Sequence, residues 1–205
     1  MINLYKTNPH LKKVVKQAEY QTLGSMMFLY WLVKNINPKH ILEFGTGFGC
    51  SAIFMALGAE RGTIVTVDDY RGDTANSLGE PEKNIVACGV VDKIRLIAGN
   101  TKDTWLKHWT KEMPEIVFMD ASHYAVDLQG EYSTLKNVIP KDHILVIDDV
   151  FAQDVYSFVN ELSKMEKYKA CSILKLHYGV AVLHTNMDKY FEKVNNAIRE
   201  AYSHE

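Results

Sequence analysis

The most constraining feature of the sequence is a run of three glycines at alternate positions, between an apolar segment and a helical pattern. Ile41–Ala56 reads ILEFGTGFGCSAIFMA, with Gly45, Gly47 and Gly49 in its middle. Glycine has no Cβ, so its backbone can turn sharply and come close to a ligand. A strand, a glycine turn and a helix start form the nucleotide cradle of open α/β folds. We therefore expect a parallel α/β fold with a nucleotide site at this turn.

The glycine spacing indicates which nucleotide the turn accepts. The dinucleotide fingerprint G-x-G-x-x-G/A fails, because Cys50 stands where its last small residue would fall. Glu43 precedes the first glycine by two residues, and a carboxylate there would repel a pyrophosphate but attract a sulfonium and an ammonium group. The pattern E-x-G-x-G-x-G resembles the first motif of S-adenosylmethionine-dependent methyltransferases with the Rossmann-like fold. A glycine turn without a ligand is the alternative, although its entropic cost needs a reason.

Apolar runs alternate with helical patterns along the rest of the chain, as in a parallel sheet covered by helices. The expected parallel strands are His40–Phe44, Thr63–Val67, Ile94–Ala98, Glu115–Met119 and His143–Ile147. Two short runs, Ala170–Leu174 and Val180–Leu183, predict a closing hairpin. Methyltransferases of this fold end in such a hairpin. The resemblance therefore implies a Rossmann-like α/β fold, with a mostly parallel seven-stranded sheet, a C-terminal antiparallel hairpin and helices on both faces.

Helical spacing of apolar residues predicts the remaining elements. The expected helices are Met1–Lys16, Gln17–Asn35, Cys50–Leu57, Pro81–Cys88, a short one near Lys102, Ala125–Val138, Val150–Tyr168 and Asn186–Ser203. Arg71–Glu80 is expected to be a loop, because it is rich in Gly, Asp, Asn and Ser. The lysine-rich Met1–Lys16 helix fits either a solvated surface or a lid over the cofactor site, and the sequence leaves both open.

The length and composition fit one globular domain. The chain has 205 residues, 47% of them hydrophobic and 23% charged, with no repeat and no Pro/Gly/Ser linker. We predict a single methyltransferase domain over residues 1–205. It comprises an N-terminal helical cap over 1–38, a sheet core over 39–185 and a C-terminal helix over 186–205.

The net charge and the cysteine content argue against several classes of binding partner. The net charge of −2 argues against a dedicated nucleic-acid binder, and the fourth strand ends MDASH rather than in the Pro-Pro-aromatic sequence of base N-methylation. Three scattered cysteines imply neither a zinc site nor a disulfide framework. No stretch has the length of a membrane span and no signal peptide precedes the domain, so we expect no membrane partner and a cytoplasmic location. Related small methyltransferases are often dimers, which makes a homodimer a candidate state.

Carboxylates follow several expected strands. Asp68 ends the second strand, Asp120 follows the fourth, and Asp148 and Asp149 follow the fifth. The C-terminal ends of parallel strands lie on one edge of a sheet, where ligands bind. An acid roughly 20 residues after the glycine turn is where such folds hold ribose hydroxyls, so Asp68 is the expected ribose ligand. For any one of these acids, a helix N-cap is the alternative role.

The loop after the third strand is expected to flank the adenine ring. Its polar residues could also cap the following helix, and the two roles are compatible. The complete expected cofactor-binding set is Glu43, Gly45, Thr46, Gly47, Gly49, Ser51, Asp68, Gly99, Asn100, Thr101 and Asp120.

Three aspartates on one sheet edge would repel one another unless a cation lay between them or one were protonated. Hard oxygen ligands favour Mg²⁺, Ca²⁺ or Mn²⁺. The segments VFMDASH and LVIDDVF resemble the metal motifs of the cation-dependent O-methyltransferases of the catechol and caffeoyl-CoA types, and also bacterial macrolide-sugar and cephalosporin-tailoring methyltransferases. The resemblance implies that Asp120, Asp148 and Asp149 bind Mg²⁺, with Asp149 in place of the catechol-type asparagine.

The same resemblance points to a general base. Catechol-type enzymes use a lysine three residues after the first metal aspartate, and His123 stands at that spacing after Asp120. Histidine is a suitable base near neutral pH. A surface histidine at a helix start is the alternative. We take His123 and Asp120 as the expected catalytic residues.

These expectations combine into one predicted function, the S-adenosylmethionine-dependent O-methylation of a small hydroxylated molecule, with Mg²⁺ as a second candidate cofactor. An NAD(P)-dependent oxidoreductase is the first alternative. It fits the glycine turn and Asp68, but Glu43, Cys50 and the closing hairpin count against it. A non-catalytic cofactor-binding protein of methyltransferase fold is the second.

Overall fold

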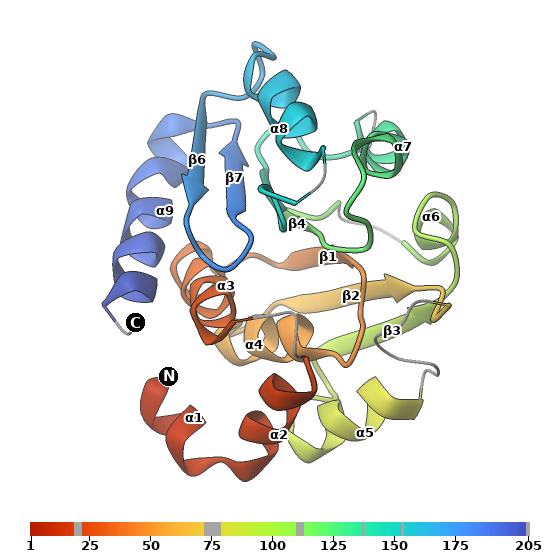
Figure 1. Ribbon diagram of the computed structural model, residues 1–205, viewed down its shortest axis with the longest axis vertical. Coiled ribbons are helices and arrows are strands. Elements are labelled where there is room, and N and C mark those ends of the chain that lie inside the picture. Colours follow the sequence, from red (N-terminus) through yellow and green to blue (C-terminus); the bar gives the residue numbers. More distant parts are fainter. Residues whose placement is uncertain (19–21, 72–78, 110–112, 137, 153, 204–205) are drawn as a thin grey trace.

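The fold is built on one seven-stranded sheet, in the order β3-β2-β1-β4-β5-β7-β6 (Figure 1). The computed structural model describes residues 1–18, 22–71, 79–109, 113–136, 138–152 and 154–203. The strands are β1 (His40–Phe44), β2 (Thr63–Asp68), β3 (Ile94–Ala98), β4 (Ile116–Met119), β5 (Ile144–Ile147), β6 (Ala170–Leu174) and β7 (Val180–His184). Strands β1 to β5 pair in parallel, and β7 pairs antiparallel with both β5 and β6. The predicted mostly parallel sheet with a closing antiparallel hairpin is confirmed.

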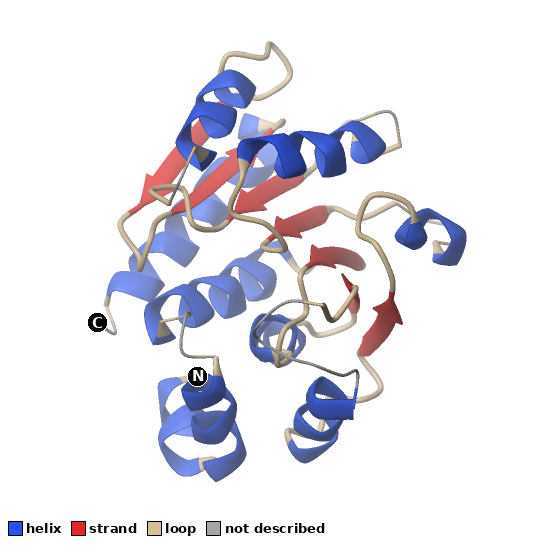
Figure 2. Cartoon of the chain, turned by 45° about the vertical axis from the view of Figure 1, so that its right-hand side comes forward, coloured by secondary structure: helices blue, strands red, loops and turns tan. Residues whose placement is uncertain are grey.

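Helices cover both faces of this sheet, as expected (Figure 2). The helices are α1 (Ile2–Thr7), α2 (Pro9–Gln17), α3 (Leu23–Ile36), α4 (Cys50–Gly58), α5 (Gly79–Ala87), α6 (Thr104–His108), α7 (Ala125–Leu135), α8 (Val155–Ser163) and α9 (Met187–Tyr202). One core joins α2, α3, α4, α5 and α9 to the sheet, and a second joins α6, α7 and α8 to its other face. In β1, Ile41 belongs to the first core and Leu42 to the second, because successive side chains of a strand point to opposite faces.

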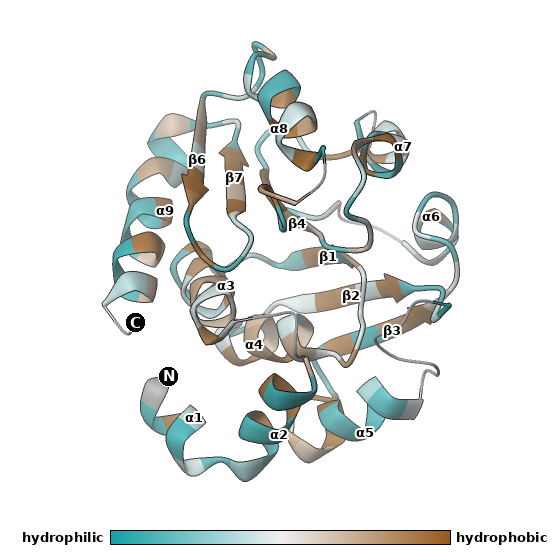
Figure 3. Ribbon diagram, in the orientation of Figure 1, coloured by the Kyte–Doolittle hydropathy of each residue, from teal (hydrophilic) through white to brown (hydrophobic). Residues whose placement is uncertain are grey.

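The inner strands are apolar throughout because they are covered on both sides. Every residue of β4 and of β5 is buried, which is why their sequences are continuous apolar runs without polar alternation. Figure 3 shows this apolar colouring on the strands, whereas α9 carries both colours along its length as an amphipathic helix does. Among the buried residues of β1 to β5, the polar exceptions are Glu43 in β1 and Thr66 in β2.

The N-terminal segment differs from its expectation as a single helix. It forms α1 and α2, which meet at Asn8 and Pro9. The Asn8 side chain accepts hydrogen bonds from the backbone N–H groups of His10 and Leu11, so it caps the start of α2. Pro9 lacks an N–H and suits the first position of a new helix better than the interior of a continuous one.

Two other expected elements are longer than the observed ones. The helix expected over Val150–Tyr168 is observed as α8, because the residues just after β5 form a turn in which the Ala152 N–H donates to the Asp149 carbonyl. The helix expected over Gln17–Asn35 is observed as α3 from Leu23 onward, and residues 19–21 lie outside the described part of the chain. Residues 72–78 of the expected Arg71–Glu80 loop also lie outside it.

The register of the parallel strands brings their C-terminal ends into line. Phe44 pairs with Val67 on one side and with Met119 on the other, and Met119 pairs with Ile147. The residues that follow these positions therefore emerge at one edge of the sheet. Within the described ranges, no helix is both long and apolar enough to cross a membrane.

His143 lies immediately before β5, and its burial makes the neutral ring part of the fold. Its Nδ1 lies 2.7 Å from the Pro140 carbonyl oxygen, and its Nε2 lies 3.3 Å from the Tyr168 hydroxyl. Burial lowers the pKa of this histidine to about 4, because the charged ring would lose its hydration.

We expect the wild-type protein to lose stability relative to a His143→Gln variant as the pH falls from about 6.5 to about 4. In this window the unfolded chain takes up a proton that the folded chain excludes, so the stability is fully present above about pH 6.5 and is lost toward pH 4. Between these pH values, the free energy of unfolding of the wild type should fall by about 2–3 kcal/mol relative to that of the variant. Urea unfolding of both proteins at pH 7.5 and 4.5 measures it, and a difference that does not change with pH contradicts the prediction.

Candidate functional site

A cavity of about 670 Å³ lies at the carboxyl edge of the sheet. Segments from separate parts of the chain form its wall: Ala18, Gly45–Phe48, Cys50, Asp68, Asp69, Asn100–Lys102, Asp120–His123, Asp127, Glu131 and Asp149. They come from the end of α2, from the glycine turn and the start of α4, from the end of β2, from the loops after β3, β4 and β5, and from α7. Because these segments are distant in sequence, the cavity exists only when the sheet is assembled.

The glycine turn passes directly under the end of β4. Gly45 adopts φ +92°, and a Cβ built on it would lie 2.5 Å from the backbone oxygen of Asp120. That distance is far below a van der Waals contact, so only glycine allows the two segments to approach this closely. The Asp120 N–H donates to the Phe44 carbonyl oxygen at 2.9 Å, which joins β4 to β1 at the same place.

The Asp68 carboxylate holds the turn from the neighbouring strand. Its Oδ2 accepts hydrogen bonds from the backbone N–H groups of Thr46 and Gly47, each at 2.9 Å. Its Oδ1 accepts one from the Tyr70 N–H at 2.7 Å. The residue expected to bind ribose therefore lies on the cavity wall and also determines the conformation of the turn beside it.

Glu43 lies beneath the turn rather than on the cavity wall. Its side chain is fully buried in β1, and its Oε1 accepts a hydrogen bond from the Ser51 hydroxyl on α4. In the described structure its Oε2 has no hydrogen-bond partner. Burial raises the pKa of this carboxyl group to about 7, because the charged form is deprived of water.

The structure brings most of the expected cofactor-binding set to one place. Gly45, Thr46, Gly47, Asp68, Asn100, Thr101 and Asp120 line the cavity. Glu43, Gly49, Ser51 and Gly99 do not. The turn and α4 cover the Glu43 carboxylate, because β1 ends one residue later, and its expected contact with the cofactor stays a prediction.

His123 and Asp149 form an ion pair at the cavity wall. Nδ1 of His123 lies 2.6 Å from Oδ2 of Asp149, and the hydrogen bond between them raises the pKa of the histidine above 6.5. Asp149 has φ +54°, a left-handed conformation that costs a non-glycine residue about 1–2 kcal/mol. Such strain is typical of residues whose side chain must point in one direction.

The aspartate pair after β5 is buried and only partly hydrogen-bonded. Burial and the charge of Asp149 raise the pKa of Asp148 to about 7. In the described structure, Oδ1 of Asp148 and Oδ1 of Asp149 have no hydrogen-bond partner. Two adjacent buried carboxylates with unused oxygens fit the ligand chemistry of a hard divalent cation.

The expected three-aspartate metal site is not assembled in the structure. Among the described residues, no three His, Cys, Asp or Glu side chains are grouped closely enough to hold a metal ion. One reason is that Asp149 directs Oδ2 to His123. The donor chemistry of Asp148 and Asp149 fits a cation, and a metal site with Asp120 as its third ligand stays a prediction.

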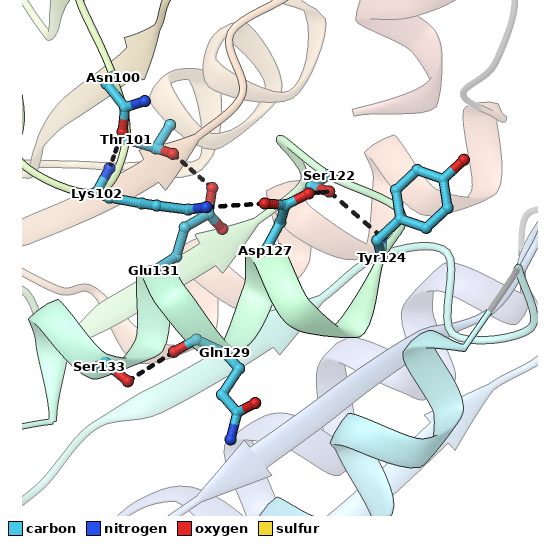
Figure 4. Close-up of polar contacts among 9 residues, drawn as sticks. All are labelled: Asn100, Thr101, Lys102, Ser122, Tyr124, Asp127, Gln129, Glu131 and Ser133. Atoms are coloured by element: carbon cyan, nitrogen blue, oxygen red, sulfur yellow. Dashed lines mark hydrogen bonds and ion pairs between the residues drawn. The ribbon is translucent and has the colours of Figure 1, made fainter.

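A second polar cluster joins the loop after β3 to α7 (Figure 4). The Thr101 hydroxyl donates to Oε1 of Glu131 at 2.5 Å. Nζ of Lys102 lies 2.8 Å from Oδ1 of Asp127, whose Oδ2 accepts a hydrogen bond from the Ser122 hydroxyl at 3.1 Å. The cluster ties two loops of the cavity wall to one helix.

The cavity wall also contains Lys102, Asp127 and Glu131, which were not expected there from the sequence. Asp127 and Glu131 are four residues apart and share one face of α7, and α7 begins five residues after Asp120. That combination was available as a signal, but acids on an amphipathic helix usually face water. Asn100 does not cap the following helix, because α6 begins at Thr104 with Asp103 at its N-cap position. The Oδ1 of Asn100 instead accepts the Lys102 N–H at 2.8 Å in the turn before that helix.

The amino-acid sequence is similar to those of known methyltransferases. A family model described as a methyltransferase domain matches residues 42–150, which run from the glycine turn to just past Asp149. Catechol O-methyltransferase B of Danio rerio is 25% identical over 147 residues, which are 68% of this chain and 53% of the relative. The chain therefore spans about half the length of that relative.

Solved structures share the fold. The O-methyltransferase TomG of Streptomyces achromogenes, in complex with SAM, has a TM-score of 0.74 at 16% identity, covering 90% of this chain and 95% of that one. The O-methyltransferase of Bacillus cereus, in complex with SAH, has a TM-score of 0.67 at 16% identity, covering 90% of this chain and 96% of that one.

We expect Gly45→Ala to destabilise the protein by at least about 3 kcal/mol, since it combines a left-handed φ with a backbone clash. Gly89→Ala is the matched control. Gly89 has φ +72°, but a Cβ there would meet nothing within 4 Å, so only the conformational cost of about 1 kcal/mol should appear. Urea unfolding of both variants measures the free energies. Equal losses would show that the contact with Asp120 is not the constraint.

Proposed function

The chain belongs to the methyltransferase-domain family, and on that premise we propose that it transfers a methyl group from S-adenosylmethionine to a hydroxyl group of a small molecule. The observation that carries this proposal is the meeting, in one cavity, of the glycine turn with the His123–Asp149 pair. The family match and the catechol O-methyltransferase relative support it. A methyl donor and a proton acceptor are the two things that O-methylation requires.

The proposed cofactor position follows the cavity wall. We place the methionine part at Gly45, Thr46 and Gly47, where the backbone can approach most closely. Asp68 would hold the ribose hydroxyls with its remaining acceptor capacity. The adenine ring would lie beside the loop after β3, at Asn100 and Thr101.

In the proposed mechanism His123 removes the proton of the acceptor hydroxyl. Its Nδ1 is engaged by Asp149, so Nε2 is the nitrogen that takes the proton. Asp149 fixes the orientation of the ring and stabilises its charged form. The hydroxyl oxygen attacks the methyl carbon in line with the breaking carbon–sulfur bond, and S-adenosylhomocysteine leaves. Asp120 lies on the same wall, where its role is to help position the reacting groups.

We also propose that the site binds Mg²⁺, and the steps described above do not depend on it. Asp148 and Asp149 would supply its protein ligands through their unused Oδ1 atoms, and Asp120 is the third ligand that the sequence motifs imply. When bound, a divalent cation lowers the pKa of a hydroxyl group and orients it. The single-domain organisation, the homodimer and the cytoplasmic location remain predictions from the sequence.

Calorimetric titration with S-adenosylhomocysteine tests the proposal. We expect a Kd in the micromolar range for the wild type and weaker binding, by about tenfold or more, for Asp68→Asn, which weakens both the turn and the ribose contact. Asp69→Asn is the matched control, since Asp69 pairs with the exposed Arg71 and should matter much less. Binding of NADH in place of S-adenosylhomocysteine would favour the oxidoreductase alternative.

Calorimetric titration also tests whether the site binds Mg²⁺. We expect Mg²⁺ to bind the complex with S-adenosylhomocysteine, and Asp148→Asn to weaken that binding because it removes a buried carboxylate. A heat signal that is identical in the variant would remove Asp148 from the ligand set.

His123→Ala should lower kcat by roughly 10²–10⁴-fold, because it removes the proton acceptor. The affinity for S-adenosylhomocysteine should stay unchanged, and Asp149→Asn should give a smaller loss by misorienting the ring. His10→Ala changes an exposed histidine of α2 and is the control. The measurement is S-adenosylhomocysteine release with a panel of small catechols and phenols. Full activity of His123→Ala on a turned-over acceptor would exclude His123 as the base.

A further inference from the structure

Glu131 is the buried acid that the proposed mechanism does not use. It lies on α7 with only 1% of its surface exposed, yet it forms part of the cavity wall beside Asn100 and Thr101. Its Oε1 is occupied by the Thr101 hydroxyl. In the described structure its Oε2 has no hydrogen-bond partner. Burial raises the pKa of the carboxyl group to about 7, so the protein alone does not fully stabilise its charge.

Neighbouring groups are already paired and do not satisfy that second oxygen. Lys102 is the nearby cation, and its charge lowers the pKa of Glu131. Its Nζ binds Oδ1 of Asp127 at 2.8 Å, and its stem lies along α7 at Gly130, where a Cβ would meet Lys102 Cε at 3.0 Å. Asp127 in turn holds the Ser122 hydroxyl. Figure 4 shows that Asp127 and Glu131 leave α7 on the side of Thr101 and Lys102, whereas Gln129 leaves it on the other side.

An unsatisfied buried acceptor is costly and calls for a donor from outside the protein. Leaving a buried acceptor unpaired is expensive, and a hydrogen bond to a charged group is stronger than one between neutral groups. A ligand that brings an N–H group to this wall would recover that energy. The nucleoside proposed for this end of the cavity carries such a group, because adenine has an exocyclic amine.

We propose that Glu131 selects the adenine base by accepting a hydrogen bond from its exocyclic amino group at Oε2. Thr101 is the positioning residue, because its hydroxyl holds the other carboxylate oxygen and so directs the free one. This inference rests on the proposed function, since it takes the bound nucleoside to be that of S-adenosylmethionine. It adds a carboxylate from α7 to the base site, beyond the loop residues that the sequence motifs indicate.

The test compares two ligands whose purine rings differ at position 6 and at the neighbouring N1, which carries a proton only in hypoxanthine. S-inosylhomocysteine carries a carbonyl oxygen in place of the 6-amino group, so it presents an acceptor to Glu131 instead of a donor. The wild type should bind S-adenosylhomocysteine about tenfold to a hundredfold more tightly than the inosine analogue, because one charged hydrogen bond is lost and an acceptor faces an acceptor. Equal affinities in the wild type would overturn the inference without any variant.

Two substitutions then localise the selectivity. Glu131→Gln offers an amide –NH₂ to the carbonyl oxygen, so the affinity ratio should fall to about threefold or less. Glu131→Asp keeps the charge, but its side chain is one methylene group shorter and holds the carboxylate farther from the ligand. The affinity ratio should therefore fall as well. Gln129→Ala is the control on the same helix. The exposed Gln129 side chain leaves α7 on the side away from Thr101 and Lys102, so this variant should leave the ratio unchanged.

The outcomes separate the inference from the proposed function. If the wild type binds neither ligand, the proposed function fails and the inference fails with it. If the wild type binds S-adenosylhomocysteine but both Glu131 variants keep the wild-type ratio, only the inference is wrong, and Glu131 acts solely as the anchor of Thr101. A ratio that falls in Gln129→Ala as much as in Glu131→Gln would also overturn the assignment to Glu131. Thermal unfolding of each variant verifies that it is folded.

Discussion

The close approach of the Asp120 carbonyl to Gly45 is the constraint on which the rest of the site depends. It brings the end of β4 onto the turn that follows β1 and leaves no space for a Cβ. The Asp68 carboxylate, reaching over from β2, then accepts two N–H groups of the same turn. Three strand ends are thereby joined at one point, and the loops that follow them must face a common cavity.

Near this point the protein buries several carboxyl groups without giving all their oxygens a hydrogen-bond partner. Burial raises the pKa values of Glu43, Glu131 and Asp148 to about 7. Each also has a carboxylate oxygen without a hydrogen-bond partner in the described structure. A stable core would avoid such groups. Their concentration at the edge of the sheet, together with the strained φ of Asp149, marks the region where stability is given up for chemistry.

The proposed catalytic residues show which contacts the spacing of residues along the chain can predict. His123 could be found from its distance to Asp120 along the chain, because both belong to the segment after one strand. Its partner could not, since Asp149 follows β5 and meets the ring only through the parallel pairing of β4 with β5. For the same reason Asp149 was expected beside a metal ion, whereas its Oδ2 is engaged by a histidine. Glu131 escaped notice because nothing along α7 reveals that Thr101 lies against it.

The sequence by itself determined the positions of the strands along the chain, the closing hairpin and the edge that carries the polar groups. It could do so because doubly covered parallel strands are continuous apolar runs, and because alternate glycines permit few backbone conformations. Only the tertiary structure decided which polar atoms meet. It placed Glu43 beneath the turn, Asp149 against His123 and Glu131 against Thr101. These pairings depend on how closely distant backbones approach and on strand register, and no local pattern of residues encodes either.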